Sequence, residues 1–451
     1  MRIVIVGMGK FGKILTEHLV KEDHDILVID TNPTIIEDVV NQFDVKGFSG
    51  NGASYGVQEE AEVKDADVLI ASTGNDEMNI LCCLVAKKIG VSHTIARIRN
   101  PEYSLQARLM SKELGVDLTC NPDEDTAMEI SRILRFPQAI KVDTFANGKV
   151  DLVEIKVDAH SPLKNKSLIQ IHTKYQIHVL VCAVKRGDDV IIPSGDFILR
   201  EGDDVYLTSS SKEMVTAFRK LGIFSEKLKS VMIIGGGRIT YYLVPLLLAN
   251  RIHVKIIENN HESCLKLSQA FPRASIIYGD GTNQKLLREE GLESVDCLIA
   301  LTGMDETNMI VSAFSKSLKC PKVITKVNRS QYDIILNRIG LESIVSPKEV
   351  FSASIIRYVR GMESSHGSEF KTLYRLVNNR VEALEFLISE KTDFTGIPLK
   401  KLKIKKNFLI ASIIRRDEVI IPSGESTIEP FDSVVIITAS TFVKDVSDIL
   451  E

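Results

Sequence analysis

MRIVIVGMGKFGKILTEHLVKEDHDILVID, residues 1–30, is the stretch that decides the fold class of this chain. An apolar run at 2–6 predicts a strand, the glycine-rich GMGKFG at 7–12 opens a predicted helix, and a second apolar strand ends at Asp30. A carboxylate thus follows Gly12 by 18 residues. In this context the GxGxxG pattern indicates a βαβ unit that binds a dinucleotide. A tight strand-to-helix turn that binds nothing is the alternative.

The residue types in this unit suit the chemistry of a dinucleotide. Gly7 permits a tight turn, Gly9 lets a pyrophosphate approach the backbone, and Gly12 lets the helix pack closely on the strand. The helix N-terminus offers free N–H groups and a positive dipole end to the phosphates. Asp30 would accept hydrogen bonds from a ribose 2′-OH and repel a 2′-phosphate, which favours NAD over NADP. The candidate loop residues are Gly7, Met8, Gly9, Lys10, Phe11 and Gly12.

Further candidate ligands follow the next predicted strands. Strands are expected near 45–48, 67–71 and 94–98. Because ligands of an open parallel sheet sit beyond the carboxyl ends of its strands, the loops after these strands belong to the same crevice as the glycines. At the end of the third strand, the guanidinium of Arg97 is placed to reach a phosphate. The candidates are Asn51, Thr73, Gly74 and Arg97.

Composition bounds the class of protein. The 451 residues are 44% hydrophobic and 26% charged, as in an ordinary globular protein, and the net charge of −4 argues against a general affinity for nucleic acid. No apolar run approaches the roughly 20 residues that span a bilayer, and Lys10 interrupts the N-terminal apolar run, so we expect neither a transmembrane helix nor a signal peptide. The seven cysteines lack C-x-x-C or metal-ligand spacing, which indicates buried thiols in a reducing compartment.

The whole pattern repeats in the second part of the chain. Gly7 and Gly235 are 228 residues apart, and so are Asp30 and Glu258. A repeat of this length and order indicates a duplicated structural unit. The clearest matched segments are ASTGNDE at 71–77 with ALTGMDE at 300–306, and IIPSG at 191–195 with IIPSG at 420–424.

The predicted fold class is α/β, a tandem duplication of a Rossmann-like parallel-sheet domain followed by a small α+β domain. The expected nucleotide-binding domains span 1–121 and 228–346, and the small domains span 138–222 and 366–451. Alternating apolar residues predict the strands of the small domains. Between the first two domains, the sequence NPDE at 121–124 predicts a helix with Asn as its cap and Pro at its first position.

The second half carries matching candidate residues, with differences where binding is decided. Thr240 stands in the place of Gly12 and removes the residue that allows the closest helix packing. Asp280 stands where the first half has Asn51. On this fingerprint, a bound dinucleotide and another ligand are both open for the second site. The candidates are Gly235, Gly236, Gly237, Arg238, Ile239, Glu258, Asp280, Thr302 and Gly303.

No other cluster predicts chemistry. The nine histidines lack ligand spacing, and no Ser/His/Asp or Cys/His set can be defended, so we expect neither a metal site nor catalytic residues. The lysine-rich run at 400–406 is more typical of a solvated face than of a lipid contact. The pair Tyr241–Tyr242 is interpreted as helix packing rather than base stacking.

This order of motifs resembles the RCK (KTN) regulatory modules of potassium channels and transporters. The resemblance rests on the strand–GxGxxG–helix–strand–Asp unit, then STG at 72–74, Ala96-Arg97, NPEY at 100–103, the capped helix and the small α+β domain. Two such modules in one chain resemble, over essentially the full length, the cytosolic regulatory subunits of Trk potassium uptake systems.

The resemblance implies a nucleotide sensor without enzymatic activity. Such a subunit is expected to bind NAD(H), or ATP and ADP, and to gate a membrane potassium-translocating subunit of the TrkH/TrkG type. It is expected in the cytoplasm, peripheral at the inner face of the cell membrane, as a homo-tetramer that forms a gating ring. The rival hypothesis is an NAD-dependent oxidoreductase in which the second half supplies the substrate site.

Overall fold

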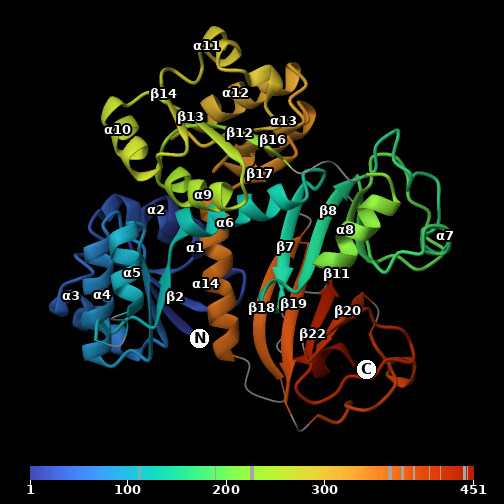
Figure 1. Ribbon diagram of the computed structural model, residues 1–451. Coiled ribbons are helices and arrows are strands. Elements are labelled where there is room, and N and C mark those ends of the chain that lie inside the picture. Colours follow the sequence, from blue (N-terminus) through green and yellow to red (C-terminus); the bar gives the residue numbers. More distant parts are fainter. Residues whose placement is uncertain are drawn as a thin grey trace.

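The computed structural model describes the chain except residues 110, 112, 188, 224–227, 364–367, 377–379, 390–391, 406, 417, 440–442, 444 and 451. Within the described part, the strands form two six-stranded parallel sheets and two five-stranded antiparallel sheets, which alternate along the chain (Figure 1). The predicted fold class, a tandem duplication of a Rossmann-like domain and a small α+β domain, is therefore confirmed.

The first parallel sheet has the strand order β3-β2-β1-β4-β5-β6. Its central strand β1 pairs with β2 and β4, and Ile5 lies opposite Val28 and Ile70. These three side chains are fully buried, as expected when helices cover both faces of a parallel sheet. The elements are β1 (Arg2–Val6), α1 (Lys10–Val20), β2 (Asp25–Asp30), α2 (Pro33–Phe43), β3 (Lys46–Ser49), α3 (Tyr55–Glu60), β4 (Val68–Ala71), α4 (Asp76–Ile89), β5 (His93–Arg97), α5 (Pro101–Leu109) and β6 (Leu118–Cys120).

The second parallel sheet repeats this order as β14-β13-β12-β15-β16-β17. Its first helix, α9, contains Pro245, and its central strand is buried like that of the first sheet. The elements are β12 (Ser230–Ile234), α9 (Arg238–Ala249), β13 (His253–Glu258), α10 (His261–Ala270), β14 (Ser275–Tyr278), α11 (Gln284–Glu289), β15 (Cys297–Ala300), α12 (Asp305–Ser317), β16 (Lys322–Lys326), α13 (Asp333–Arg338) and β17 (Ser343–Val345).

The small sheets also match strand for strand, as β10-β9-β11-β8-β7 and β21-β20-β22-β19-β18. The helices of the first small domain have only 3-10 turns, at 399–401 and 446–449, as described counterparts in the second. The elements of the first are β7 (Lys141–Phe145), β8 (Val150–Lys156), α7 (Leu168–Tyr175), β9 (Leu180–Arg186), β10 (Asp189–Ile191), β11 (Asp204–Ser210) and α8 (Ser211–Lys220), and those of the second are β18 (Ser368–Leu376), β19 (Val381–Ile388), β20 (Phe408–Arg415), β21 (Glu418–Ile420) and β22 (Ser433–Thr438).

Two crossover helices are exchanged between the halves. Helix α6 (Pro122–Arg135) begins as predicted, because the side chain of Asn121 accepts hydrogen bonds from the first turn, and it packs on α9 of the second half. Helix α14 (Pro347–Glu363) packs on α1 of the first half (Figure 1). The rings of Phe11 and Phe351 meet edge to face with centroids 5.4 Å apart. Each parallel-sheet domain thus shares its core with the crossover helix of the other half.

The two small sheets also pack against each other. Phe145 and Tyr374 meet with ring centroids 4.9 Å apart, and the Tyr374 hydroxyl donates to the carbonyl oxygen of Thr144 at 2.8 Å. The backbone N–H of Ala146 donates to Glu385 Oε2 at 3.0 Å. Since side chains of both sheets form one hydrophobic cluster, the halves are joined at the small domains as well as at the crossover helices.

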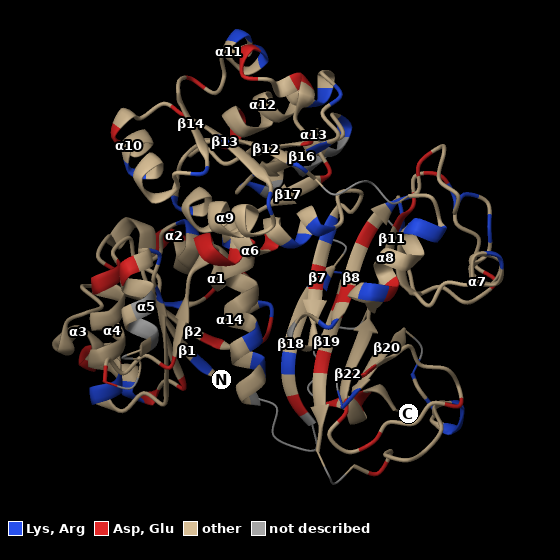
Figure 2. Ribbon diagram, in the orientation of Figure 1, with Lys and Arg blue, Asp and Glu red and all other residues tan. Residues whose placement is uncertain are grey.

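Charged residues are spread over the whole molecule. Figure 2 shows acidic and basic positions interspersed on both parallel-sheet domains and both small domains, in keeping with the net charge of −4. Among the helices that the structure describes, none combines the length and the apolar character needed to cross a bilayer. Of the lysine-rich run, Lys400 and Lys403 are exposed, Lys400 pairs with Glu425 at 2.5 Å, and Lys406 lies outside the described residues.

Candidate functional site

The glycine loop of the first half is shaped by close backbone contacts. Gly7 has a φ of +93°, and a Cβ atom there would lie 2.8 Å from the backbone of Thr73. A Cβ atom at Gly12 would overlap the carbonyl oxygen of Gly7. At Gly9, by contrast, a Cβ atom would meet nothing within 4 Å. The loop is therefore tight against β4 and α1, and it leaves open space above Gly9.

Asp30 is anchored to this loop from the end of β2. Its Oδ2 accepts a hydrogen bond of 2.6 Å from the backbone N–H of Met8, and its Oδ1 accepts one of 2.9 Å from Asn32. A carboxylate has about four lone-pair sites, so acceptor capacity is left for a hydroxyl group. Asn51, at the end of β3, accepts from the N–H of Ala53 at 3.1 Å. The glycines, Asp30 and Asn51 thus lie at one edge of the sheet, as predicted.

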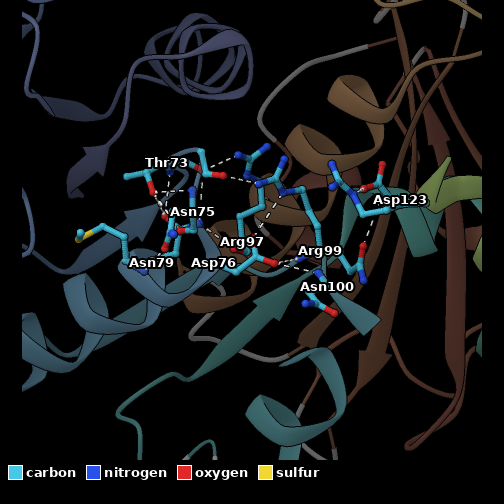
Figure 3. A network of polar contacts seen from close by, with 12 residues as sticks. Thr73, Asn75, Asp76, Asn79, Arg97, Arg99, Asn100 and Asp123 are labelled. Atoms are coloured by element: carbon cyan, nitrogen blue, oxygen red, sulfur yellow. Dashed lines mark hydrogen bonds and ion pairs between the residues drawn. The ribbon is translucent and has the colours of Figure 1, made fainter. Parts of the chain in front are cut away.

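Thr73 and Arg97 are joined by Asn79, which the sequence analysis missed (Figure 3). Asn79 Oδ1 accepts from the N–H of Thr73 at 2.8 Å and from its hydroxyl at 2.7 Å. Its Nδ2 donates to the carbonyl oxygen of Arg97 at 2.8 Å. Asn79 is fully buried, so its amide holds the ends of β4 and β5 together.

The guanidinium of Arg97 is buried beside the glycine loop. It lies over the ring of Phe11, with Cζ 4.4 Å from the ring centroid, and one of its Nη groups donates to the carbonyl oxygen of Thr73. Its Nε is buried and has no hydrogen-bond partner among the described residues. Burial lowers the pKa of Arg97 to about 10, and the neighbouring charge of Arg99 adds to this effect. A buried cation with a free donor suits an anionic ligand.

A second set of polar groups that sequence reasoning missed lies next to Arg97 (Figure 3). Asp76 is buried, and its Oδ2 accepts hydrogen bonds of 2.8 Å from the backbone N–H groups of both Arg99 and Asn100. Arg99 in turn donates to the carbonyl oxygen of Gly74 at 2.5 Å. Asp76 and Arg99 therefore fix the loop after β4, which contains Thr73 and Gly74.

The second crevice repeats this construction. Glu258 Oε2 accepts from the N–H of Gly236 at 2.6 Å, as Asp30 does from Met8. Asn308 Oδ1 accepts from the N–H of Thr302 at 2.8 Å, and its Nδ2 donates to the carbonyl oxygen of Lys326 at 3.0 Å. The remaining sequence candidates Gly235, Gly237 and Gly303 lie in the corresponding loops, and Ile239 is buried in the first turn of α9.

Thr240 changes the second glycine loop without opening it. Its side chain is fully buried, and its hydroxyl donates to the carbonyl oxygen of Gly235 at 2.6 Å. In the first half the same space is closed by the contact between Gly12 and Gly7. Asp280 is exposed and accepts from the N–H and hydroxyl of Thr282, both at 2.8 Å, and these hydrogen bonds lower its pKa.

The two crevices are linked across the interface of the halves. Arg238, in the first turn of α9, donates to Asp123 of α6 at 2.8 Å. The Tyr242 hydroxyl donates to the carbonyl oxygen of Arg99 at 3.0 Å and accepts from Asn121 at 2.8 Å. Tyr242 is thus a packing residue, as predicted, and it connects α9 to both the loop after β5 and the cap of α6.

Cysteine and histidine provide no reactive centre in the described part of the chain. The seven cysteines are free and buried, and burial raises the pKa of Cys82 to about 12. Buried thiols of this kind are inert. Across the described residues, no group of three or more potential ligands could hold a metal ion.

The comparison with protein families decides the relationship. The model of the TrkA-N domain matches residues 3–122 and 231–347, and the model of the TrkA-C domain matches residues 152–222 and 383–451. This chain belongs to the TrkA family. Both family domains occur twice and in alternation, in agreement with the duplication in the sequence and in the fold.

Curated relatives match the TrkA-family chain from end to end. It is 32% identical over 450 residues to the Trk system potassium uptake protein TrkA homolog of Archaeoglobus fulgidus, with 100% of both chains covered. It is 31% identical to the TrkA homolog 1 of Methanosarcina mazei, with 99% of both chains covered. It is 30% identical to the TrkA protein of Vibrio alginolyticus, with 100% of this chain and 99% of that protein covered.

Solved structures share the fold of this TrkA-family chain. The GsuK RCK domain superposes with a TM-score of 0.63 at 19% identity, over 97% of this chain and 92% of that chain. The GsuK channel bound to NAD superposes with a TM-score of 0.64 at 18% identity, over 97% and 77%. The tandem RCK architecture implied by the sequence resemblance is thereby confirmed at the level of the fold.

Proposed function

We propose that this TrkA-family chain is the nucleotide-binding regulatory subunit of a potassium uptake system. The support is the full-length match to relatives named Trk system potassium uptake proteins. The single structural observation that carries the nucleotide role is Arg97, a buried guanidinium with a free Nε donor beside an open glycine loop. A protein without an anionic ligand at this point would leave that buried charge uncompensated.

The residue roles in the first crevice follow from its geometry. The open backbone at Gly9 and the N-terminus of α1 receive the phosphates, with Arg97 as their counter-charge. Asp30 accepts hydrogen bonds from the ribose hydroxyls with the capacity that Met8 and Asn32 leave free. Asn51, Thr73 and Gly74 complete the rim. The proposed contacts in the second crevice are Gly235, Gly236, Gly237, Arg238, Ile239, Glu258, Asp280, Thr302 and Gly303.

The proposed ligands are NAD(H) and the adenine nucleotides ATP and ADP. A solved relative in fold, the GsuK channel, is named as bound to NAD. Both crevices place a carboxylate at the ribose position, which disfavours the 2′-phosphate of NADP. We assign ligand binding to segments 1–121 and 228–346, and transmission of the bound state to the small domains at 138–222 and 366–451.

The proposed partner is a membrane potassium-translocating subunit of the TrkH/TrkG type, which a homo-tetrameric gating ring of this chain contacts from the cytoplasm. A nucleotide can shift such a ring only by the difference in its affinity for two conformations. The exchanged helices α6 and α14 supply a mechanical link, because each starts beside one nucleotide domain and packs on the other. A change at either crevice therefore acts on both halves.

Potassium uptake in cells tests this function. Rubidium uptake at low external potassium is measured in a strain without this chain, and in the same strain with the wild-type chain, Asp30→Ala or the exposed control Lys212→Ala. We expect uptake to fall without the chain, to return with wild type and Lys212→Ala, and to change in rate with Asp30→Ala. The same uptake in all strains, in the absence of a redundant system, would refute the proposal.

The rival function, an NAD-dependent oxidoreductase, makes a different prediction. It requires substrate-dependent turnover of NADH by the purified chain, and this turnover must be lost in Asp30→Ala. The geometry favours the sensor, because both crevices repeat the same nucleotide-site design and neither holds a base or hydride-transfer partner among the described residues. Turnover together with normal uptake would place the enzyme first.

A further inference from the structure

Each crossover helix presents one charged side chain to the glycine loop of the other half. Helices α6 and α14 both begin at a proline, Pro122 and Pro347, and the next residue is Asp123 in one and Lys348 in the other. These residues hold the same place in the internal repeat. Their charges are opposite, so the duplication has produced two crevices with different electrostatic surroundings.

In the second crevice the cation of the glycine loop already has a carboxylate partner. Asp123 Oδ2 lies 2.8 Å from Nε of Arg238. The carboxylate is 14% exposed, so solvent screens this ion pair only partly. Asp123 also supplies the largest attraction that opposes the effect of burial on the pKa of Lys326. The cationic groups of the second crevice are therefore compensated by the protein itself.

In the first crevice a lysine takes the place of that carboxylate. The first turn of α14 lies against the start of α1, because the rings of Phe351 and Phe11 meet there at 5.4 Å. Lys348 is half-buried in this turn, and its Nζ donates to the carbonyl oxygen of Asn328 at 3.3 Å. Burial lowers the pKa of Lys348, and the charge of Lys10 in the glycine loop lowers it further, against the attraction of Asp305.

The first crevice therefore gathers positive charge that the protein does not pair. Lys10 is exposed in the glycine loop, Lys348 faces it from the other half, and Arg97 lies buried behind it. Asp123 also attracts Arg97, but the charge of Arg238, to which Asp123 is bonded, offsets this attraction. Two or more cations converging on one loop suit a ligand with several adjacent negative charges.

The geometry points to a division of ligands between the crevices: the first selects a nucleoside triphosphate over ligands with fewer phosphate charges, through Lys348, and the second has no such preference, because of Asp123. This inference rests on the proposed nucleotide function and adds the ligand class of each site. The other charge difference has the same direction, since the exposed Asp280 of the second crevice stands at the place of Asn51 in the first. Both differences make the second crevice less favourable for a chain of phosphates.

The test uses full-length chains with one crevice blocked. Gly9→Asp and Gly237→Asp are matched blocking variants, because a Cβ atom at either position meets nothing within 4 Å and both residues have a negative φ. The added carboxylate repels phosphate at that loop. Calorimetric titrations with ATP, ADP and NADH, in EDTA to remove divalent cations, then report on one crevice at a time. Circular dichroism and thermal unfolding verify that each variant is folded.

We expect the first crevice, in the Gly237→Asp chain, to bind ATP more tightly than ADP by about tenfold, the usual effect of one charge-assisted contact. Adding Lys348→Gln should remove most of this preference and leave NADH affinity nearly unchanged. The second crevice, in the Gly9→Asp chain, should bind ATP and ADP within about twofold of each other, and Asp123→Asn should increase its affinity for ATP. Lys348→Gln in the otherwise wild-type chain repeats the test without a blocking variant.

Two results would overturn the inference. One is the same ratio of ATP to ADP affinity in both crevices, and the other is an unchanged ratio in the first crevice after Lys348→Gln. Failure of the proposed function looks different, because the wild-type chain would then bind none of the three nucleotides.

Discussion

Arg360 and Glu22 form a buried ion pair that joins the end of the second crossover helix to the first parallel-sheet domain. Arg360 Nε lies 2.7 Å from Glu22 Oε2, and Nη2 lies 2.7 Å from Oε1. The same guanidinium forms two bonds with Glu382 of β19. One arginine therefore ties the first nucleotide domain to the small sheet of the second half. The repeat places Asn250 where the first half has Glu22, so this link exists on one side of the molecule.

Removal of Glu22 should destabilise the folded chain. In Glu22→Ala the buried guanidinium of Arg360 keeps only part of its compensation, and breaking one partner of a buried pair costs about 3 kcal/mol of unfolding free energy. Equilibrium unfolding in urea measures this loss. Glu17→Ala is the control, because Glu17 forms an exposed pair with Lys21 that is worth at most about 0.5 kcal/mol. Equal losses in the two variants would contradict the coupling.

His18 should make the interface between α1 and α14 sensitive to acid. Its Nδ1 lies 2.7 Å from the hydroxyl of Ser352, and burial, followed by the charge of Arg375, lowers its pKa from 6.5 to about 4, against the opposing charges of Glu17 and Glu22. Between these two pH values the unfolded chain binds a proton that the folded chain does not. Stability should therefore fall as the pH drops from 6.5 towards 4, by at most about 3 kcal/mol from this group.

The measurement for His18 is the difference in unfolding free energy between pH 7 and pH 4.5, compared with His18→Gln. Glutamine keeps a polar group for Ser352 and does not titrate, so the variant should lose less stability on acidification. If the wild type and the variant show the same dependence on pH, other groups govern the acid response.

Gly12 should be far less replaceable than Gly9. A Cβ atom at Gly12 would overlap the carbonyl oxygen of Gly7, whereas one at Gly9 has open space. Gly12→Ala is expected to cost about 1–3 kcal/mol of unfolding free energy through overpacking, and Gly9→Ala within about 0.5 kcal/mol. Thermal unfolding of the two variants measures the contrast. A mild Gly12→Ala would mean that α1 withdraws readily from the loop, as α9 is arranged in the second half to hold Thr240.

Local pattern was sufficient for the glycine loops and the carboxylates. The fingerprint specifies its own strand, turn and helix, so Gly7 and Asp30 were expected in contact with one crevice, and the structure anchors Asp30 to that loop. The repeat then transferred the prediction to Glu258. The same repeat also contained a signal for two missed residues, because GNDEMN at 74–79 and GMDETN at 303–308 share the Asp and Asn that hold the loops.

The exchange of crossover helices could not be predicted in this way. Phe11 and Phe351, or His18 and Ser352, are more than 300 residues apart, and no local periodicity records which of two similar nucleotide domains a helix covers. Strand β7 was missed for another reason. Its polar residues Lys141 and Asp143 resemble a loop, but they are 3.5 Å apart and Asp143 is buried, so an ion pair replaces the apolar pattern.

Asp30 should govern nucleotide affinity in the first crevice and leave the second unaffected. In a chain with the second crevice blocked by Gly237→Asp, Asp30→Ala should weaken NAD(H) binding by about 1–3 kcal/mol, the loss expected for hydrogen bonds to a charged group. Asp30→Asn keeps one acceptor oxygen for the N–H of Met8, and so separates loop anchoring from ribose recognition.

The matched measurement for Asp30 uses Glu258→Ala in the Gly9→Asp chain. Because Glu258 holds Gly236 at 2.6 Å as Asp30 holds Met8, a ribose contact in both crevices predicts losses of similar size. A loss confined to Asp30→Ala would assign ribose recognition to the first crevice alone. Unchanged affinity in Asp30→Ala would instead show that the open space above Gly9 is not where the nucleotide binds, since no ligand can occupy that loop with its ribose at the end of β2 and ignore the carboxylate there.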